Sequence, residues 1–177
     1  AAALEVYKRQ VLAGTRGAPG HRKTDRLFGL IERMRLPAVL FAEGGGGRPG
    51  DTDYPVVSAL DTRAFALWAR LSGLVPRIAI VAGRCFAGNA VLAGCSDLIV
   101  ATEGSSLGMG GPAMIEGGGL GRVDPDDVGP LETQARGGVV DAIAADEAEA
   151  TAIAKRLLGY FQGVTPPGAT PDQTALR

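Results

Sequence analysis

The sequence contains few of the residues from which most catalytic and metal sites are built. Its 177 residues include one histidine, His21, and two cysteines, Cys85 and Cys95. The cysteines lack CxxC or other metal-ligand spacing, and the histidine is far from both in sequence. SxxK and Walker motifs are also absent. We therefore predict no metal site and no nucleophilic triad, and we interpret both cysteines as small buried apolar residues.

Long apolar runs and an excess of one charge are missing too. No apolar run approaches the roughly 20 residues of a membrane span, and there is no signal peptide. The 18 basic and 19 acidic residues leave a net charge of −1, which does not favour nucleic acid. The sequence thus predicts a cytoplasmic protein whose partners are neither membranes nor nucleic acids.

The length suits one domain with a substantial core. The sequence begins without methionine and contains a proline-rich stretch at 165–171. Both features suggest a piece cut from a longer polypeptide. We expect a domain over residues 1–163, incomplete at its N-terminus, and an interdomain linker over residues 164–177.

Glycine is abundant, with 27 residues gathered in clusters rather than in a periodic repeat. Clusters at 44–47, 83–88 and 108–111 each follow an apolar run. The middle cluster connects a strand predicted at 78–81 to a helix, which precedes a strand at 98–100. One interpretation is that the glycines of this cluster only permit a tight turn between strand and helix. A helix that begins at glycine also presents bare N–H groups to an anion, and three strands that end in glycine suggest one shared site.

Other elements are predicted from apolar periodicity and from proline and cap positions. They are a helix from Thr24 that ends before Pro37, a strand at 38–42, a helix with Leu60, Phe65, Leu67, Trp68 and Leu71 on its apolar side, a helix beginning at Pro112, a strand at 139–141, and a final helix with a capping box of Asp146 and Glu149. Carboxylates at 124–127 are interpreted as solvated caps.

Residues 75–102, followed by 106–112, resemble the crotonase superfamily. Within it, residues 44–48, 109–121 and 138–163 resemble the carboxyltransferase component of biotin-dependent acyl-CoA carboxylases. The resemblance covers nearly the whole chain. It implies an α/β fold of the crotonase-like (ClpP/crotonase) type, which is a spiral of strand-strand-helix repeats in a single domain.

The resemblance also implies where the chemistry occurs. In crotonase-type enzymes two peptide N–H groups on neighbouring loops hold the enolate-like oxygen of an acyl-CoA thioester. On that pattern the catalytic positions are Gly88, Asn89, Ala87, Gly46 and Gly47, and the substrate-binding positions are Gly45, Arg48, Gly110, Gly111, Pro112, His21, Arg22 and Lys23. Asn89 replaces the second glycine of the family's pair. Because a backbone N–H does not depend on its side chain, we expect the donors to survive and Asn89→Gly to be tolerated.

Two of these assignments have alternatives. Residues 21–23 form either a solvated basic loop ahead of the first helix or a contact with the phosphates of coenzyme A. Arg48 forms either an internal salt bridge or a ligand contact.

Departures from the superfamily indicate the reaction. Val91 and Gly111 stand where hydratases carry two catalytic glutamates, and neither residue can move a proton. Carboxyltransferases dispense with a side-chain base, because the ureido nitrogen of carboxybiotin takes the α-proton once carbon dioxide is released. The resemblance therefore implies transfer of a carboxyl group from carboxybiotin to the α-carbon of an acyl-CoA, whose chain length the sequence leaves open.

The implied partners are a biotin carrier domain that supplies carboxybiotin, a biotin carboxylase, a C-terminal carboxyltransferase domain, and further copies in an oligomer, a hexamer in the parent protein. Since biotin lies against the other domain, this chain alone should bind acyl-CoA and transfer no carboxyl group.

Other functions stay open. A crotonase-type isomerase or hydrolase would take its acid or base from elsewhere, such as Glu116 or Asp51. A non-catalytic assembly module would use the same helices to hold oligomers together. A dinucleotide-binding fold is disfavoured, because residues 108–113 fit GxGxxA without an acidic residue about twenty positions later.

Overall fold

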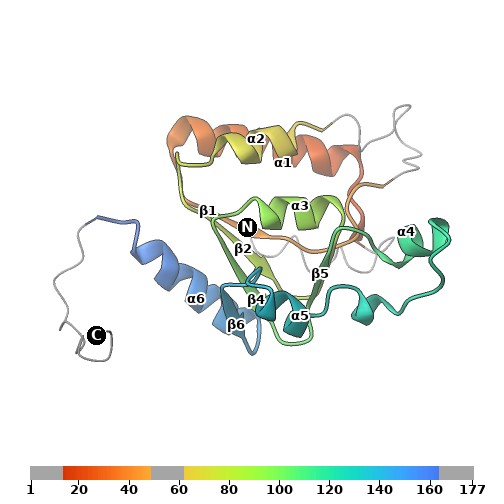
Figure 1. The fold of residues 1–177 in the computed structure, drawn as a ribbon. Coiled ribbons are helices and arrows are strands. Elements are labelled where there is room, and N and C mark those ends of the chain that lie inside the picture. Colours follow the sequence, from red (N-terminus) through yellow and green to blue (C-terminus); the bar gives the residue numbers. More distant parts are fainter. Residues whose placement is uncertain (1–13, 49–61, 164–177) are drawn as a thin grey trace, which may run out of the picture.

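The structure, a computed structural model, describes residues 14–48 and 62–163 (Figure 1). Its elements in chain order are α1 (Ala18–Met34), β1 (Ala38–Phe41), α2 (Ala64–Arg70), β2 (Arg77–Val81), β3 (Arg84–Phe86), α3 (Gly88–Gly94), β4 (Leu98–Thr102), β5 (Ser106–Gly108), α4 (Pro112–Gly117), the 3-10 turn η4 (Pro125–Asp127), α5 (Leu131–Arg136), β6 (Ala142–Ala144) and α6 (Glu147–Gly159). The apolar residues at 6–12 also predict a strand from the sequence. That stretch, the proposed linker, Leu60 and Asp51 lie outside the described residues.

Two parallel sheets organise the described residues. Strands β1, β2, β4 and β6 form the larger sheet in that order, and β3 pairs with β5 in the smaller one. Gly44, which follows β1, bridges Cys85 in β3 and so extends the smaller sheet. Because β2 and β4 are each followed by a short strand of the smaller sheet and then by helices, the predicted strand-strand-helix repeat is confirmed.

The core lies on both faces of the larger sheet. Strand β2 is buried throughout, as expected for an inner parallel strand. Its residues Ile78 and Ile80 pack with α6, whereas Ala79 and Val81 pack with α3 and the smaller sheet. A further cluster joins α1 and α2, where the rings of Phe28 and Trp68 have centroids 4.6 Å apart. These contacts fix α3 between the larger sheet and α2.

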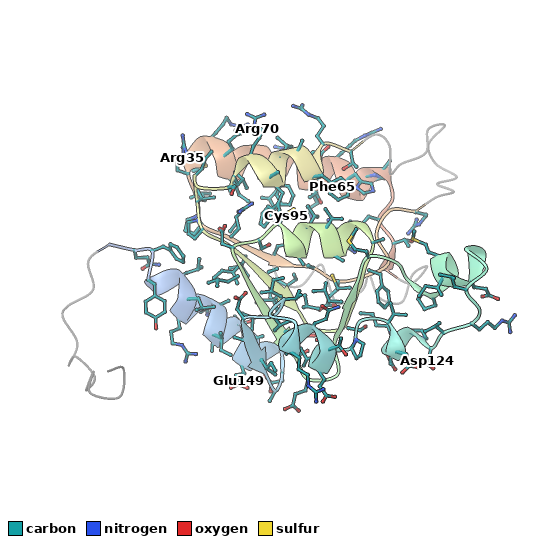
Figure 2. The ribbon with its side chains drawn as sticks, in the orientation of Figure 1. Arg35, Phe65, Arg70, Cys95, Asp124 and Glu149 are labelled. Atoms are coloured by element: carbon teal, nitrogen blue, oxygen red, sulfur yellow. The ribbon has the colours of Figure 1, made fainter. Side chains whose placement is uncertain are left out.

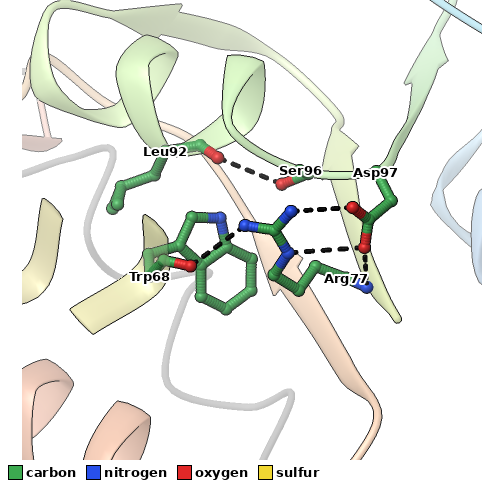
Figure 3. Close-up of polar contacts among 5 residues, drawn as sticks. All are labelled: Trp68, Arg77, Leu92, Ser96 and Asp97. Carbon is green, nitrogen blue, oxygen red and sulfur yellow. Dashed lines mark hydrogen bonds and ion pairs between the residues drawn. The ribbon is translucent and has the colours of Figure 1, made fainter. Parts of the chain in front are cut away.

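A partly buried ion pair anchors the start of β2 (Figure 3). The Arg77 guanidinium binds both carboxylate oxygens of Asp97, at 2.7 and 3.3 Å, and donates to the Trp68 carbonyl at 3.0 Å. The Arg77 backbone N–H also donates to Asp97 at 2.8 Å. Because the Arg77 side chain is only 4% exposed, this network ties α2, β2 and the turn before β4 together.

Helix α1 begins earlier than predicted. Pro19 occupies the first turn, a position that suits proline because its missing N–H would have no partner in the helix. The helix therefore includes residues 21–23, and the prediction of a basic loop there was wrong. Within the described residues, no helix has the length and apolar character needed to cross a bilayer.

Two strands differ from their predictions. β3 was missed, because three residues between Gly83 and Ala87 are too few to show an alternating pattern. The last strand covers Ala142–Ala144 and not 139–141, since the Val139 N–H still donates to the Gln134 carbonyl at the end of α5, at 2.9 Å. The helix start at Pro112 is confirmed, and Asp146 and Glu149 cap α6 as predicted, with Glu149 accepting from the Ala145 N–H.

Candidate active site

The first and second glycine clusters touch each other. Gly46 has φ +85°, a conformation that side-chain-bearing residues rarely adopt. A Cβ at Gly46 would lie 2.9 Å from the Ala87 Cβ and 3.0 Å from the Gly88 nitrogen. Glycine at position 46 therefore permits a direct backbone contact between the loop after β1 and the start of α3.

Helix α3 begins with open N–H groups. Its cap residue Ala87 has φ 52° and ψ −124° and provides no side-chain acceptor. The first hydrogen bond of the helix runs from the Val91 N–H to the Ala87 carbonyl at 3.1 Å. The helix therefore leaves the N–H groups of Gly88, Asn89 and Ala90 without internal acceptors, and these groups favour negative charge. The left-handed φ of Ala87 is a strained conformation of the kind that often occurs at functional sites.

Backbone hydrogen bonds hold the loop after β1 in place. The Gly44 N–H donates to the Arg84 carbonyl at 2.8 Å, and the Phe86 N–H donates to the Gly44 carbonyl at 2.9 Å. The Gly46 carbonyl accepts from the Arg16 N–H at 2.7 Å. The loop is therefore fixed on one side by β3 and on the other by the segment before α1.

The third glycine cluster joins the other two. The Ala87 N–H donates to the Gly108 carbonyl at 3.1 Å. A Cβ at Gly111 would lie 3.5 Å from the Phe86 ring, so residues 108–111 pass close over β3. The prediction that three glycine-ended strands meet at one place is confirmed.

A cavity of about 730 Å³ opens beside this junction. Its lining is mostly apolar and glycine-rich: Thr15, Gly44, Gly45, Ala82, Gly83, Arg84, Phe86, Ala87, Gly104, Gly111, Pro112, Ala113, Met114, Pro125 and Asp126. Four of the site residues predicted from sequence, Gly45, Ala87, Gly111 and Pro112, are in this lining. Three further predicted positions are each next to a lining residue in the sequence: Gly46, Gly88 and Gly110. Gly47 and Asn89 are one position further away.

The cavity contains an ion pair that sequence reasoning missed. Arg84 on β3 binds Asp126 in η4 at 2.9 Å, and both side chains are more than half exposed. Asp126 had been interpreted only as part of a solvated cap. That interpretation holds for Asp124, whose carboxylate accepts from the Asp126 N–H at 2.9 Å. No local sequence signal pairs residues so far apart.

Arg48 makes contacts within the chain. Its guanidinium donates to the Thr15 hydroxyl at 3.3 Å and to the Thr15 carbonyl at 3.1 Å. Of the two alternatives, an internal role is the one that these contacts support. Arg48 thus positions Thr15, which lines the cavity.

The basic residues 21–23 differ in their exposure to solvent. His21 is buried in the first turns of α1, whereas Arg22 and Lys23 are exposed. None of the three lines the cavity. A buried imidazole cannot meet a solvated phosphate, so a phosphate contact is restricted to Arg22 and Lys23.

The two cysteines lie in different environments. Cys85 is fully buried. Its pKa is raised to about 12, mainly by burial and to a smaller extent by the nearby Glu43 carboxylate, while Arg16 acts in the opposite direction. The thiol therefore stays protonated at neutral pH and is no nucleophile. Cys95 is exposed at the end of α3, so the prediction of a buried residue was wrong there (Figure 2).

Glu116, one of the two alternative acids or bases named from the sequence, is not among the residues that line the cavity. Glu116 on α4 is exposed and bound to Arg122 at 2.9 Å. Within the described residues, no three His, Cys, Asp or Glu side chains gather where a metal ion could bind. The junction thus offers backbone donors beside an apolar cavity.

Residues 7–175 match the model of the carboxyl transferase domain. The chain belongs to the carboxyl transferase domain family. It is 28% identical over 154 residues to the methylmalonyl-CoA carboxyltransferase 12S subunit of Propionibacterium freudenreichii subsp. shermanii, which covers 82% of this chain and 28% of that protein. It is 30% identical over 179 residues to the biotin-dependent long-chain acyl-CoA carboxylase beta4 subunit of Mycobacterium tuberculosis, covering 95% of this chain and 33% of that protein.

Solved structures show the same fold. A single-chain, multi-domain long-chain acyl-CoA carboxylase superposes with a TM-score of 0.82 and 54% identity over 93% of this chain and 16% of that one. The transcarboxylase 12S hexamer gives a TM-score of 0.73 with 25% identity over 90% of this chain and 32% of that one. The crotonase-type fold of this family is therefore confirmed. The chain spans about a third or less of the length of these relatives.

Proposed function

We propose that this domain binds the acyl-CoA of a biotin-dependent acyl-CoA carboxylase and stabilises the enolate formed at its thioester. The observation that carries the proposal is the contact between Gly46 and the open start of α3 at Gly88, beside the apolar cavity. N–H groups from the loop at 45–47 and from Gly88 would hold the developing oxyanion. Donors fixed by the backbone need no reorganisation as the charge develops, and losing one costs about 3 kcal/mol of transition-state stabilisation.

The described cavity lining contains no free carboxylate or imidazole placed to remove the α-proton. Asp126, its acidic member, is paired with Arg84. Carboxybiotin, when bound, would supply both the carboxyl group and the proton acceptor. The cavity fits an uncharged ring or an acyl chain, because its walls include Phe86, Pro112 and Met114. In this division the protein orients the thioester, excludes water and stabilises negative charge at its oxygen.

The relatives support the wider assembly that the proposal includes. Carboxybiotin would come from a separate carrier domain, and a biotin carboxylase and a C-terminal carboxyltransferase domain would complete the enzyme. One relative is a single-chain, multi-domain carboxylase, and another is a hexameric core. We expect this chain to take part in an oligomer of the same kind.

The test is a carboxylation assay of the full-length protein that carries this domain. With ATP, labelled bicarbonate and a series of acyl-CoAs, we expect incorporation of label that avidin abolishes. Isomerisation or hydrolysis without biotin dependence would support the isomerase or hydrolase instead. Absence of any acyl-CoA binding by calorimetry would support a non-catalytic assembly module.

A further inference from the structure

Phe65 is set apart from the core side of its own helix. It lies in the first turn of α2 with 39% of its surface exposed, whereas Leu67 and Trp68 in the same helix are 7% and 1% exposed. The sequence had placed all three on one apolar side. Figure 2 shows Phe65 between α2 and α3. The cluster that joins α1 and α2 includes Leu67 and Trp68 and does not include Phe65.

The tip of the Phe65 ring lies at Gly88. If Gly88 carried a Cβ, that atom would be 3.0 Å from the Phe65 Cζ and 3.5 Å from its Cε1. The same point is 4.0 Å from the Gly46 Cα. The ring therefore reaches the junction of the two glycine loops from the α2 side. Ala87, which directly precedes Gly88, lines the cavity.

We propose that Phe65 is a specificity-determining residue for the acyl group. This inference rests on the proposed function. If the thioester oxygen is bound at Gly88, the thioester carbonyl lies near the ring, and both the acyl chain and the sulfur of coenzyme A are attached to that carbonyl. We assign the ring to the first carbons of the acyl chain, because their chemistry suits an apolar ring. An apolar ring stabilises methylene groups by removing them from water, by about fourfold in affinity for each buried methylene. The ring offers nothing to the phosphates of coenzyme A, which prefer cationic and N–H donors.

The alternative is that the ring only supports the start of α3 by packing on its backbone. The two roles differ in what they do to substrate selection. A wall beside the first acyl carbons changes the ratio of kcat/KM between short and long acyl-CoAs that differ in how many of these carbons they possess. A packing role changes the rate with every acyl-CoA by the same factor and leaves the ratio constant.

The experiment compares Phe65→Ala, Phe65→Leu and Phe65→Tyr in the full-length protein, using the acyl-CoAs that the wild type accepts. We expect Phe65→Ala to change the kcat/KM ratio of the longest to the shortest substrate by at least about tenfold. Phe65→Tyr, which retains the ring, should keep the wild-type ratio, and Phe65→Leu should fall between them. Affinity for coenzyme A without an acyl group should be unchanged. Leu74→Ala is the control, because Leu74 is 41% exposed and follows the opposite end of α2.

A constant ratio in Phe65→Ala, whether the rates fall together or stay unchanged, would overturn the inference. So would an equal loss of affinity for free coenzyme A. Failure of the proposed function would show itself differently, since the wild type would then neither carboxylate nor bind any acyl-CoA.

Discussion

The Asn89 side chain donates a 2.7 Å hydrogen bond to the backbone carbonyl of Glu43. Both residues are buried, and the bond connects the first turn of α3 to the residue that precedes the four glycines. It therefore links the two segments whose N–H groups we propose as the oxyanion site. The side chain points into the protein and leaves the N–H groups at the start of α3 uncovered.

This bond changes the expectation for Asn89→Gly, which the sequence alone predicted to be tolerated. Loss of the donor leaves the Glu43 carbonyl buried without that partner, at a cost of about 1–3 kcal/mol. We expect a lower free energy of unfolding by that amount and a lower kcat for carboxylation. Ser96→Ala is the control, since Ser96 donates to the Leu92 carbonyl at 3.0 Å at the far end of the same helix. Equal effects of the two variants would contradict the link between the loops.

Gly88→Pro tests the proposed N–H donor directly. Proline fits the first position of a helix but has no N–H, so we expect kcat to fall by about 10²–10³. Gly88→Ala is the matched variant, because it keeps the N–H while its Cβ meets the Phe65 Cζ at 3.0 Å. Its rate should fall only several-fold. Single-turnover kinetics with circular dichroism of both variants would check this, and equal losses would show that steric contact, and not the donor, matters.

Arg22 and Lys23 provide a test of phosphate binding. If they attract the phosphates of coenzyme A, the affinity for acyl-CoA should fall as salt rises, because exposed charges are screened over about 8 Å at physiological ionic strength. Replacing both with alanine should weaken binding and flatten that salt dependence. Lys155→Ala is the control, because Lys155 is also an exposed lysine but lies in α6, far from Arg22 and Lys23 in the sequence. Calorimetry over a salt series that shows no salt dependence would remove these residues from the site.

The cysteines predict a pH effect on stability. The Cys85 pKa is raised from 9.0 to about 12. Below pH 9 the thiol is protonated in both states, whereas between pH 9 and 12 only the unfolded chain loses the proton. The free energy of unfolding should therefore fall over this range by about 1.4 kcal/mol per pH unit, and Cys85→Ala should reduce that fall.

Burial also predicts different reactivity of the two cysteines. At neutral pH a thiol reagent should modify Cys95 at once and Cys85 only after unfolding; rapid reaction of Cys85 would contradict its burial.

The ion pair at the start of β2 should matter more than those on the surface. Asp97→Asn removes the anionic partner of the buried Arg77 guanidinium. Because the Asp97 side chain is itself 35% exposed, we expect a loss of about 1.5–3 kcal/mol in the free energy of unfolding, less than for a fully buried pair. Glu132→Gln breaks the pair with Arg136, in which both side chains are more than 70% exposed, and should cost well under 1 kcal/mol. Denaturant titration of both variants separates the cases. Similar losses would show that the buried network is not an anchor.

The sequence by itself determined the elements whose signals are local. The apolar runs of β2 and β4, the helix start at Pro112 and the capping pair Asp146 and Glu149 depend on neighbouring residues, so their patterns were sufficient. The glycine clusters also predicted the junction correctly, because the backbones of Gly46 and Gly88 approach so closely that a Cβ at Gly46 would not fit between them. The motifs around these glycines were enough to identify the family.

Tertiary structure decided what depends on residues far apart in the chain. Asn89 meets Glu43 across 46 positions, and Arg84 meets Asp126 across 42, distances over which helix and strand periodicity carry no information. Phe65 shares the apolar character of Leu67 and Trp68, yet only the packing of α2 on α3 turns its ring to Gly88. Local sequence therefore predicted the glycine loops of the candidate site. The side-chain contacts around these loops depend on how the strands and helices pack in the folded protein.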